Sequence, residues 1–155
     1  MTLNDILKRL KEPVAPSYIS QKKVGNSVLD FISWFDYCDI LDERCGLGNW
    51  YWEIVSTTIS DNRYFMTGRL TIAGTDRSIS QDATGTEILN CSSYGDPSSN
   101  AEAMALRRAC AKFGLARELW RKDDKPNHSY QSQLKPMGKR EITREEWLAL
   151  RAKQG

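Results

Sequence analysis

A cluster of basic residues is the part of this sequence whose chemistry is most readily inferred. Within sixteen residues the chain carries six basic side chains: Arg107, Arg108, Lys112, Arg117, Arg121 and Lys122. Glu118 is the one acidic residue among them that opposes this charge. On a helix, Arg108 and Lys112 stack on one face about 6 Å apart. This spacing approximates that of phosphates along an extended nucleic-acid strand, so the cluster predicts a polyanion site with strongly salt-dependent affinity.

The charge of the chain is divided unevenly along its length. Residues 1–100 hold 9 Lys+Arg and 13 Asp+Glu, a balance of −4, whereas residues 101–155 hold 13 and 7, a balance of +6. Such asymmetry points to an anionic partner, although basic residues also occur in solvated tails. Fifteen aromatic residues could stack on bases. Four of them are expected to pack in the core instead: Trp34, Trp50, Trp52 and Phe113.

Carboxylates at helical spacing offer a second chemistry. Asp39 lies three and four residues before Asp42 and Glu43, so a shared helix face could bind a divalent ion and serve a metal-dependent nuclease. A solvated helix face explains the same spacing and is preferred. His128 is the single histidine, and the chain has no G-x-x-x-x-G-K-[ST] phosphate-binding loop. We therefore expect no catalytic residue, no metal and no cofactor, and an activity independent of ATP.

The first third of the chain is predicted to contain two helices. Apolar residues repeat at three and four positions over residues 3–10, which indicates an amphipathic helix. Lys22 and Lys23 are expected in a polar turn. A second helix is predicted over residues 27–44, with the glycine cluster at residues 46–49 ending it.

The middle of the chain is predicted to form a three-stranded meander. Residues 50–59, 64–73 and 77–81 are rich in aromatic and β-branched residues and are separated by short turns. Short connections require antiparallel pairing. Residues 82–100, which are rich in Gly, Ser and Thr, are expected to form a mobile loop.

The last third begins with a helix of small residues, expected to start at residues 98–100 and to pack closely on a sheet or another helix. Gly114 is expected to break this helix, and residues 115–120 to add more helix. Residues 121–140 are polar and expected to be disordered, and the capping box Thr143-x-x-Glu146 predicts a short final helix.

The predicted fold class is α+β: an α-β-β-β-α domain with a three-stranded antiparallel sheet backed by helices, the topology of double-stranded-RNA-binding domains. The expected division is a domain at residues 1–120 followed by a polar linker and short helix at residues 121–155. The four cysteines form no C-x-x-C pair and no export signal is evident, so we expect reduced thiols and a cytoplasmic protein, nucleoid-associated if bacterial, with no membrane partner.

Three segments carry a family resemblance. Residues 41–50 (LDERCGLGNW) form a helix-to-strand junction, residues 95–97 lead into the basic helix at residues 105–114 (ALRRACAKFG), and residues 18–20 (YIS) precede both. In this order, spanning residues 3–120, they resemble the Rad fifty-two single-strand-annealing family, and within it the bacterial branch typified by DdrA.

The resemblance implies an oligomeric ring that holds single-stranded DNA in a basic groove. It implies annealing of complementary strands, or protection of strand ends, in recombinational DNA repair without nucleotide hydrolysis. It places the phosphate-contacting pair on Arg107 and Arg108, with Lys112 beside them. Four further basic residues complete the candidate DNA contacts: Lys22, Lys23, Arg117 and Arg69.

Other functions stay open at this point. The basic C-terminal region could dock a protein partner as part of a structural or adaptor module. The chain could instead be a metal-dependent nuclease, or it could bind double-stranded RNA. Other repair or single-strand-binding proteins are further expected partners.

Overall fold

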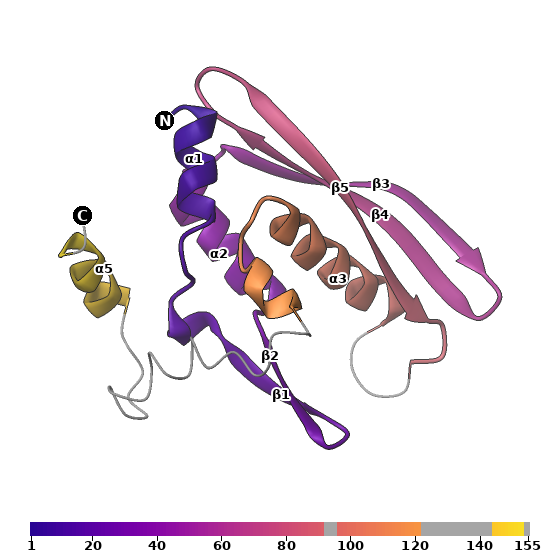
Figure 1. Cartoon of the computed structure of the whole chain (residues 1–155). Helices are drawn as coiled ribbons and strands as arrows, with labels where there is room; N and C mark the ends of the chain where they lie inside the picture. Colours follow the sequence, from indigo (N-terminus) through magenta and orange to yellow (C-terminus); the bar gives the residue numbers. More distant parts are fainter. Residues whose placement is uncertain (92–95, 122–143, 154–155) are drawn as a thin grey trace.

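A computed structural model describes residues 1–91, 96–121 and 144–153 of the chain (Figure 1). A long three-stranded sheet forms one layer, helix α3 lies across it, α2 packs beside α3, and α1 packs against α2. A separate two-stranded hairpin projects from this body (Figure 1). The α+β class and the three-stranded antiparallel sheet are confirmed. No helix within the described residues is both long and apolar enough to cross a membrane.

Helix α1 (Leu3–Leu10) begins at a capping box, and an arginine from another helix donates hydrogen bonds to carbonyls at its C-terminal end. The N–H of Asp5 donates to Thr2 Oγ1, and the N–H of Thr2 donates to the Asp5 carboxylate, both at 3.3 Å. Leu3, Ile6 and Leu10 form its buried face, as the apolar repeat predicted. A 3-10 turn, η1 (Pro16–Tyr18), then leads into the hairpin.

The prediction of one helix over residues 27–44 is wrong in its first part. Strands β1 (Ser20–Val24) and β2 (Ser27–Phe31) pair antiparallel, and helix α2 (Trp34–Cys45) starts only after them. The two-residue connection contains Gly25 with φ 61°, a conformation that glycine adopts readily and that suits a tight hairpin. Lys22 and Lys23 accordingly lie on an exposed strand and not in a turn.

The junction motif at residues 41–50 is structural. Arg44 is 3% exposed. Its guanidinium donates to four main-chain carbonyls, those of Arg9 (3.0 Å), Leu10 (3.2 Å), Glu12 (2.6 Å) and Pro13 (2.8 Å). In return, Arg9 Nη2 donates to the carbonyl of Glu43 at 3.0 Å. Each helix thus supplies an arginine that donates to carbonyl groups at or just after the end of the other helix, where most such groups lack a helical donor.

The large sheet has the order β3-β4-β5: β3 (Trp50–Ser60), β4 (Arg63–Ala73) and β5 (Ser78–Ile88). The predicted meander is confirmed, but β5 extends seven residues beyond the predicted strand, so residues 82–88 are strand and not a mobile loop. This segment looks like a turn in the sequence because it contains Asp82 and Gly85. Pairing with β4 and packing under α3 hold it extended.

Helix α3 (Pro97–Lys112) starts one residue before the predicted position, at a cap where Asp96 Oδ1 accepts from the N–H of Ser99 at 2.8 Å. Its small residues Ala101, Ala105 and Ala109 are fully buried, which confirms the predicted close packing. A Cβ at Gly85 would overlap the carbonyl of Ala101. The helix backbone therefore lies directly against β5.

The chain after α3 is described in two pieces. Gly114 ends the helix, as predicted, and η2 (Arg117–Trp120) is a single 3-10 turn where more helix was expected. Helix α5 (Arg144–Ala152) confirms the final helix, while its predicted cap at Thr143 and the polar segment lie outside the described residues. Arg151 of α5 pairs with Glu12 at 2.6 Å.

Candidate nucleic-acid interface

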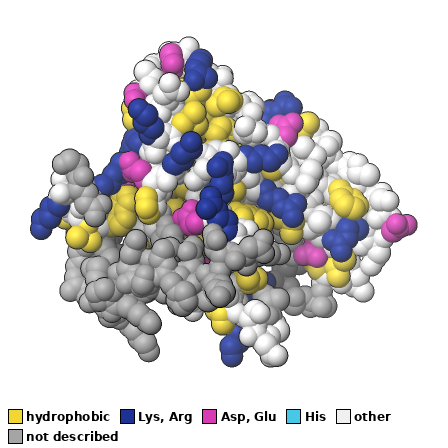
Figure 2. All heavy atoms as spheres, in the orientation of Figure 1, with side chains coloured by type: hydrophobic (Ala, Val, Ile, Leu, Met, Phe, Trp, Pro, Cys, Tyr) yellow, Lys and Arg dark blue, Asp and Glu magenta, His cyan; other side chains and the backbone are white. Residues whose placement is uncertain are grey.

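A shallow depression lies beside the C-terminal half of α3, on the side that faces β5. It is lined by Gln81, Arg108, Ala111, Lys112, Arg117 and Trp120. The sequence cluster therefore does bring three of its cations, those of Arg108, Lys112 and Arg117, to one place. Figure 2 shows Lys and Arg side chains grouped near the middle of this face of the molecule.

Main-chain carbonyls hold these three cations in position. Arg108 Nη1 donates to the carbonyl of Thr84 at 3.1 Å, and Lys112 Nζ donates to the carbonyl of Asp82, two residues earlier on β5. Arg117 donates to two carbonyls in the last turn of α3, those of Ala111 (2.8 Å) and Lys112 (3.0 Å). A carbonyl orients a cation without cancelling its charge, so the depression stays positive.

Carboxylates contribute little to this depression. Within the described part of the chain, none forms an ion pair within 4.0 Å with Arg108, Lys112 or Arg117. Asp82 is close enough for Lys112 to help lower its pKa, but the larger cause is its hydrogen bond from Arg69. The three cations can therefore engage an external anion.

Trp120 adds an exposed aromatic face to the depression. Its ring centroid lies 5.9 Å from the guanidinium carbon of Arg108, a cation–π contact. The chain reaches this position because Ala116 adopts a left-handed conformation (φ 53°) that turns η2 back over the end of α3. Sequence analysis did not single out Trp120, and its position directly after the basic cluster is the signal that could have done so.

Arg107 lies on the other flank of α3 from Arg108, since consecutive helical residues are about 100° apart. It is half-buried beside Tyr37 of α2. Burial lowers the pKa of Arg107, and the neighbouring charge of Arg108 lowers it further, while Tyr37 acts in the opposite direction. The two arginines of the family motif thus border the same half-buried arc of α3 from opposite sides.

The remaining predicted contacts lie apart from the depression. Lys22 and Lys23 are exposed on the projecting hairpin. Arg69 lies on β4, where its guanidinium makes a two-pronged contact with Asp82 (2.7 and 3.1 Å) and approaches Glu53 at 3.7 Å. Arg69 therefore links all three strands of the sheet through cross-strand pairs.

The carboxylates considered for a nuclease do not form a metal-ligand group. Asp42 Oδ1 accepts from Trp50 Nε1 at 2.7 Å, Glu43 approaches Arg144 at 3.6 Å, and Asp39 is exposed. Across residues 1–91, 96–121 and 144–153, no set of three His, Cys, Asp or Glu side chains is grouped to hold a metal ion.

Comparison with known proteins places these features in a family. No family model matches the chain. It is 36% identical over 123 residues to the DNA repair RAD52-like protein 1, mitochondrial, of Arabidopsis thaliana, an alignment that covers 78% of this chain and 69% of the relative. The chain belongs to the RAD52-like family. It is also 29% identical over 119 residues to the DNA repair RAD52-like protein 2, chloroplastic, of the same plant, covering 76% of this chain and 58% of that relative.

The family resemblance inferred from the junction and basic-helix motifs is thereby confirmed. Both RAD52-like relatives are plant proteins, and they do not support the assignment to the bacterial DdrA-like branch. That finer assignment stays a prediction from the motifs.

Proposed function

We propose that this RAD52-like protein binds single-stranded DNA and, without ATP, anneals complementary strands or protects strand ends in recombinational DNA repair. The observation that carries the proposal is the depression where Arg108, Lys112 and Arg117 meet an exposed indole. The names of the two relatives, both DNA repair proteins, support the same biological setting.

The depression suits a single strand better than a duplex. Its cations are held for contact with phosphates, while Trp120 offers a surface on which one base can stack. Phosphate contacts position a strand without reading its sequence, so the base edges stay available to a second strand. The arc of α3 between Arg107 and Arg108, which carries the half-buried Met104 and Ala111, gives the backbone a path between the two arginines.

Oligomerisation into a ring is part of the proposal. Strand β3 is an edge of the sheet, and four of its large apolar side chains are exposed: Tyr51, Ile54, Val55 and Ile59. An exposed apolar edge strand is a surface that a second chain can pair with. Each subunit offers only a few phosphate contacts, and several subunits along one strand would supply the avidity that a single domain lacks. Lys22 and Lys23 on the hairpin could extend the groove.

Fluorescence anisotropy with a labelled oligothymidylate at several salt concentrations tests the proposal. Loss of one phosphate contact should flatten the plot of log affinity against log salt by about 0.7 for single strands. We expect Arg108→Ala to weaken binding and reduce the slope by about this amount. Arg77→Ala is the matched control, because it removes the same charge at the β4–β5 turn, where Arg77 contacts Asn4 at 3.0 Å.

Equal effects of the two substitutions would show that only net charge matters and would contradict the site. Arg69→Ala is uninformative as a charge control, since it also frees Asp82. Annealing of complementary labelled strands, measured on the same samples together with particle size, tests the rest. A monomer that anneals nothing and protects no strand end from exonuclease would contradict the proposed activity.

A further inference from the structure

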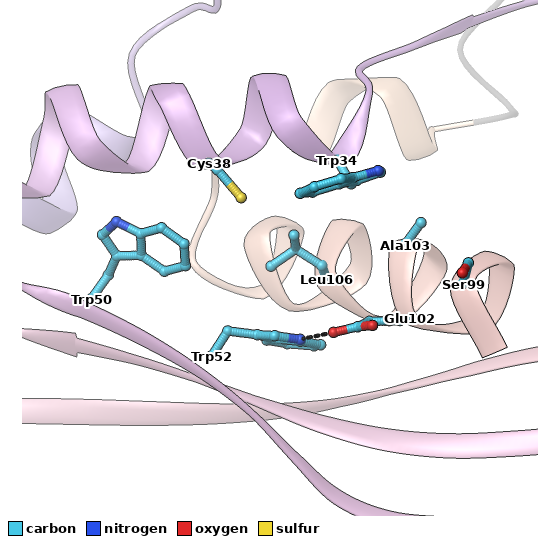
Figure 3. A pocket seen from close by; sticks show the side chains of 8 residues that line it. All are labelled: Trp34, Cys38, Trp50, Trp52, Ser99, Glu102, Ala103 and Leu106. Carbon is cyan, nitrogen blue, oxygen red and sulfur yellow. Dashed lines mark hydrogen bonds between the residues drawn. The ribbon is translucent and has the colours of Figure 1, made fainter.

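A second pocket, bounded by α2, β3 and α3 and open on one side, lies on the opposite flank of α3 from the basic depression. Its volume is about 280 Å³. Three indoles form its walls: Trp34 from α2, and Trp50 and Trp52 from β3. Figure 3 shows Trp34 and Trp52 on opposite walls, with Glu102 at the edge of the Trp52 ring and Leu106 between them. The space is therefore a slot between aromatic groups with one carboxylate at its side.

The indole N–H groups on β3 are already used. Trp50 Nε1 donates to Asp42 Oδ1 at 2.7 Å, and Trp52 Nε1 donates to Glu102 Oε1 at 3.0 Å (Figure 3). Trp52 also lies directly over Gly68 of β4, where a Cβ would overlap its ring. These contacts fix the two rings and leave mainly their π faces to meet a ligand. A π face carries negative potential and attracts cations.

The charged groups that act on the pocket lining are carboxylates, while the cation of Arg107 lies beside Tyr37 of α2. Glu102 is the one charged residue among those that line it. On α2, burial raises the pKa of Cys38, which lines the pocket, and the carboxylates of Asp42 and Asp39 raise it further. The pKa of Asp36 is also raised, first by burial and then by Asp39. A phosphate would be repelled from this pocket, whereas a cation would be attracted.

We infer that this pocket binds an arginine side chain of a protein partner. A guanidinium is planar, stacks on aromatic faces and sheds water more easily than an ammonium. The Glu102 carboxylate can accept hydrogen bonds beyond the one from Trp52, because its two oxygens offer about four lone-pair sites. Trp34 is 55% exposed, so the slot has an open side for a side chain to enter.

A separate protein fits this chemistry better than a second copy of the chain or a nucleic acid. Most described arginines of this chain already donate to its own groups, including Arg44, Arg69 and Arg117. The negative pocket and the basic depression lie on opposite flanks of α3. A partner could therefore occupy the pocket while the depression is free to bind an anion.

Fluorine NMR of the full chain labelled with 5-fluorotryptophan tests the inference. The probe is N-acetyl-arginine methylamide, titrated beside the neutral citrulline analogue. We expect shifts at Trp34, Trp50 and Trp52 with a dissociation constant on the order of millimolar, as befits one side chain. Trp120 and Trp147 serve as internal references, because each already lies against an arginine of the chain.

Three substitutions separate the contribution of charge to arginine binding from the contribution of the pocket's shape. Glu102→Gln keeps an oxygen to accept from Trp52 but removes the charge, and we expect it to weaken arginine binding about fivefold or more. Asp39→Asn removes one charge from the exposed side of α2 outside the pocket lining and should change the affinity less than twofold. Trp34→Leu should abolish the shifts at the two remaining pocket indoles.

Four results would overturn the inference. Fluorine shifts with the citrulline analogue equal to those with the arginine probe would show that the pocket does not select for charge. An unchanged affinity of Glu102→Gln for the arginine probe would show that the carboxylate does not contribute to binding. Shifts with thymidine and none with the arginine probe would identify a base pocket. Smaller oligomers for both Glu102→Gln and Trp34→Leu, with folding intact by circular dichroism, would identify a neighbouring copy as the occupant in place of a separate protein.

Discussion

Replacing Arg44 by methionine tests how far the exchange between α1 and α2 stabilises the fold. Methionine retains much of the buried stem volume and removes the guanidinium. The carbonyls of Leu10, Glu12 and Pro13 then lose this donor, while that of Arg9 still accepts from the N–H of Glu12 at 3.2 Å. A buried carbonyl without a partner costs about 1–3 kcal/mol, but water can reach some of these groups at the end of a helix. Part of this loss of stability is also offset, because folding of the variant no longer removes a charge from water.

We therefore expect Arg44→Met to lower the free energy of unfolding by about 3–5 kcal/mol, because three carbonyls are left without this donor at about 1–3 kcal/mol each and part of that cost is offset. Since whole domains are stable by only about 5–15 kcal/mol, this is a large fraction, equivalent to roughly 10–15 °C in Tm. Arg9→Met is the matched control. Arg9 makes one such bond, to the carbonyl of Glu43, so its loss should cost about 1 kcal/mol.

Urea unfolding followed by circular dichroism, at one fixed protein concentration, measures both values. A fixed concentration is needed because assembly would shift the apparent stability. A cost below 1 kcal/mol for Arg44→Met, or equal costs for the two variants, would refute the reasoning. Arg44→Lys should fall between wild type and Arg44→Met, since an ammonium keeps the charge but has three donors where the guanidinium has five.

Three other predictions follow from the same structure. Gly68→Ala should cost about 1–3 kcal/mol by overpacking and displace Trp52, seen as a shifted Trp52 signal in fluorine NMR; an unmoved signal would contradict it. Hydrogen bonds from Ser98 to Asp96, and from the Leu3 N–H to Asp76, lower the pKa values of these carboxyls below 3.8. The unfolded chain then binds more protons, so stability should fall as the pH drops below about 5 in acid titration, and a flat profile would contradict this. Burial raises the pKa of Cys45 to about 12, so iodoacetamide at pH 8 should label it at least a hundredfold more slowly than in the unfolded chain, by mass spectrometry; equal rates would contradict burial.

The sequence predicts best where local signals and tertiary packing agree. The start of α3 was predicted to within one residue, and its alanines correctly indicated close packing. The cap at Asp96 was not predicted. The β1–β2 hairpin was missed because Val28 and Phe31 fit a helical stripe as well as a strand. The Gly25 turn decides between helix and strand, because it brings residues 27–31 back along β1. The end of β5 was missed because its extended form depends on contact with α3.

The candidate site was predictable in composition but not in arrangement. Adjacent basic residues in the sequence gave no sign that Arg107 faces α2 while Arg108 faces β5, because that depends on how α3 is rotated on the sheet. Nor could charge alone show that Arg69 is held by two carboxylates. Trp34, expected in the core, is more than half exposed because α2 begins at this residue, beyond the part of the helix that the sheet and α3 cover.

The close approach of α3 to Gly85 has a mechanical consequence. With no room for a methyl group between the helix backbone and β5, α3 cannot slide along the sheet without losing this contact. Arg108 and Lys112 donate hydrogen bonds to main-chain carbonyls of β5, so the distance between the two cations is fixed within each subunit. In an assembly on DNA, the distance between the phosphates that these two cations bind would then be fixed within each subunit. A bend or a change in length of the bound strand would then have to occur between the binding sites of neighbouring subunits.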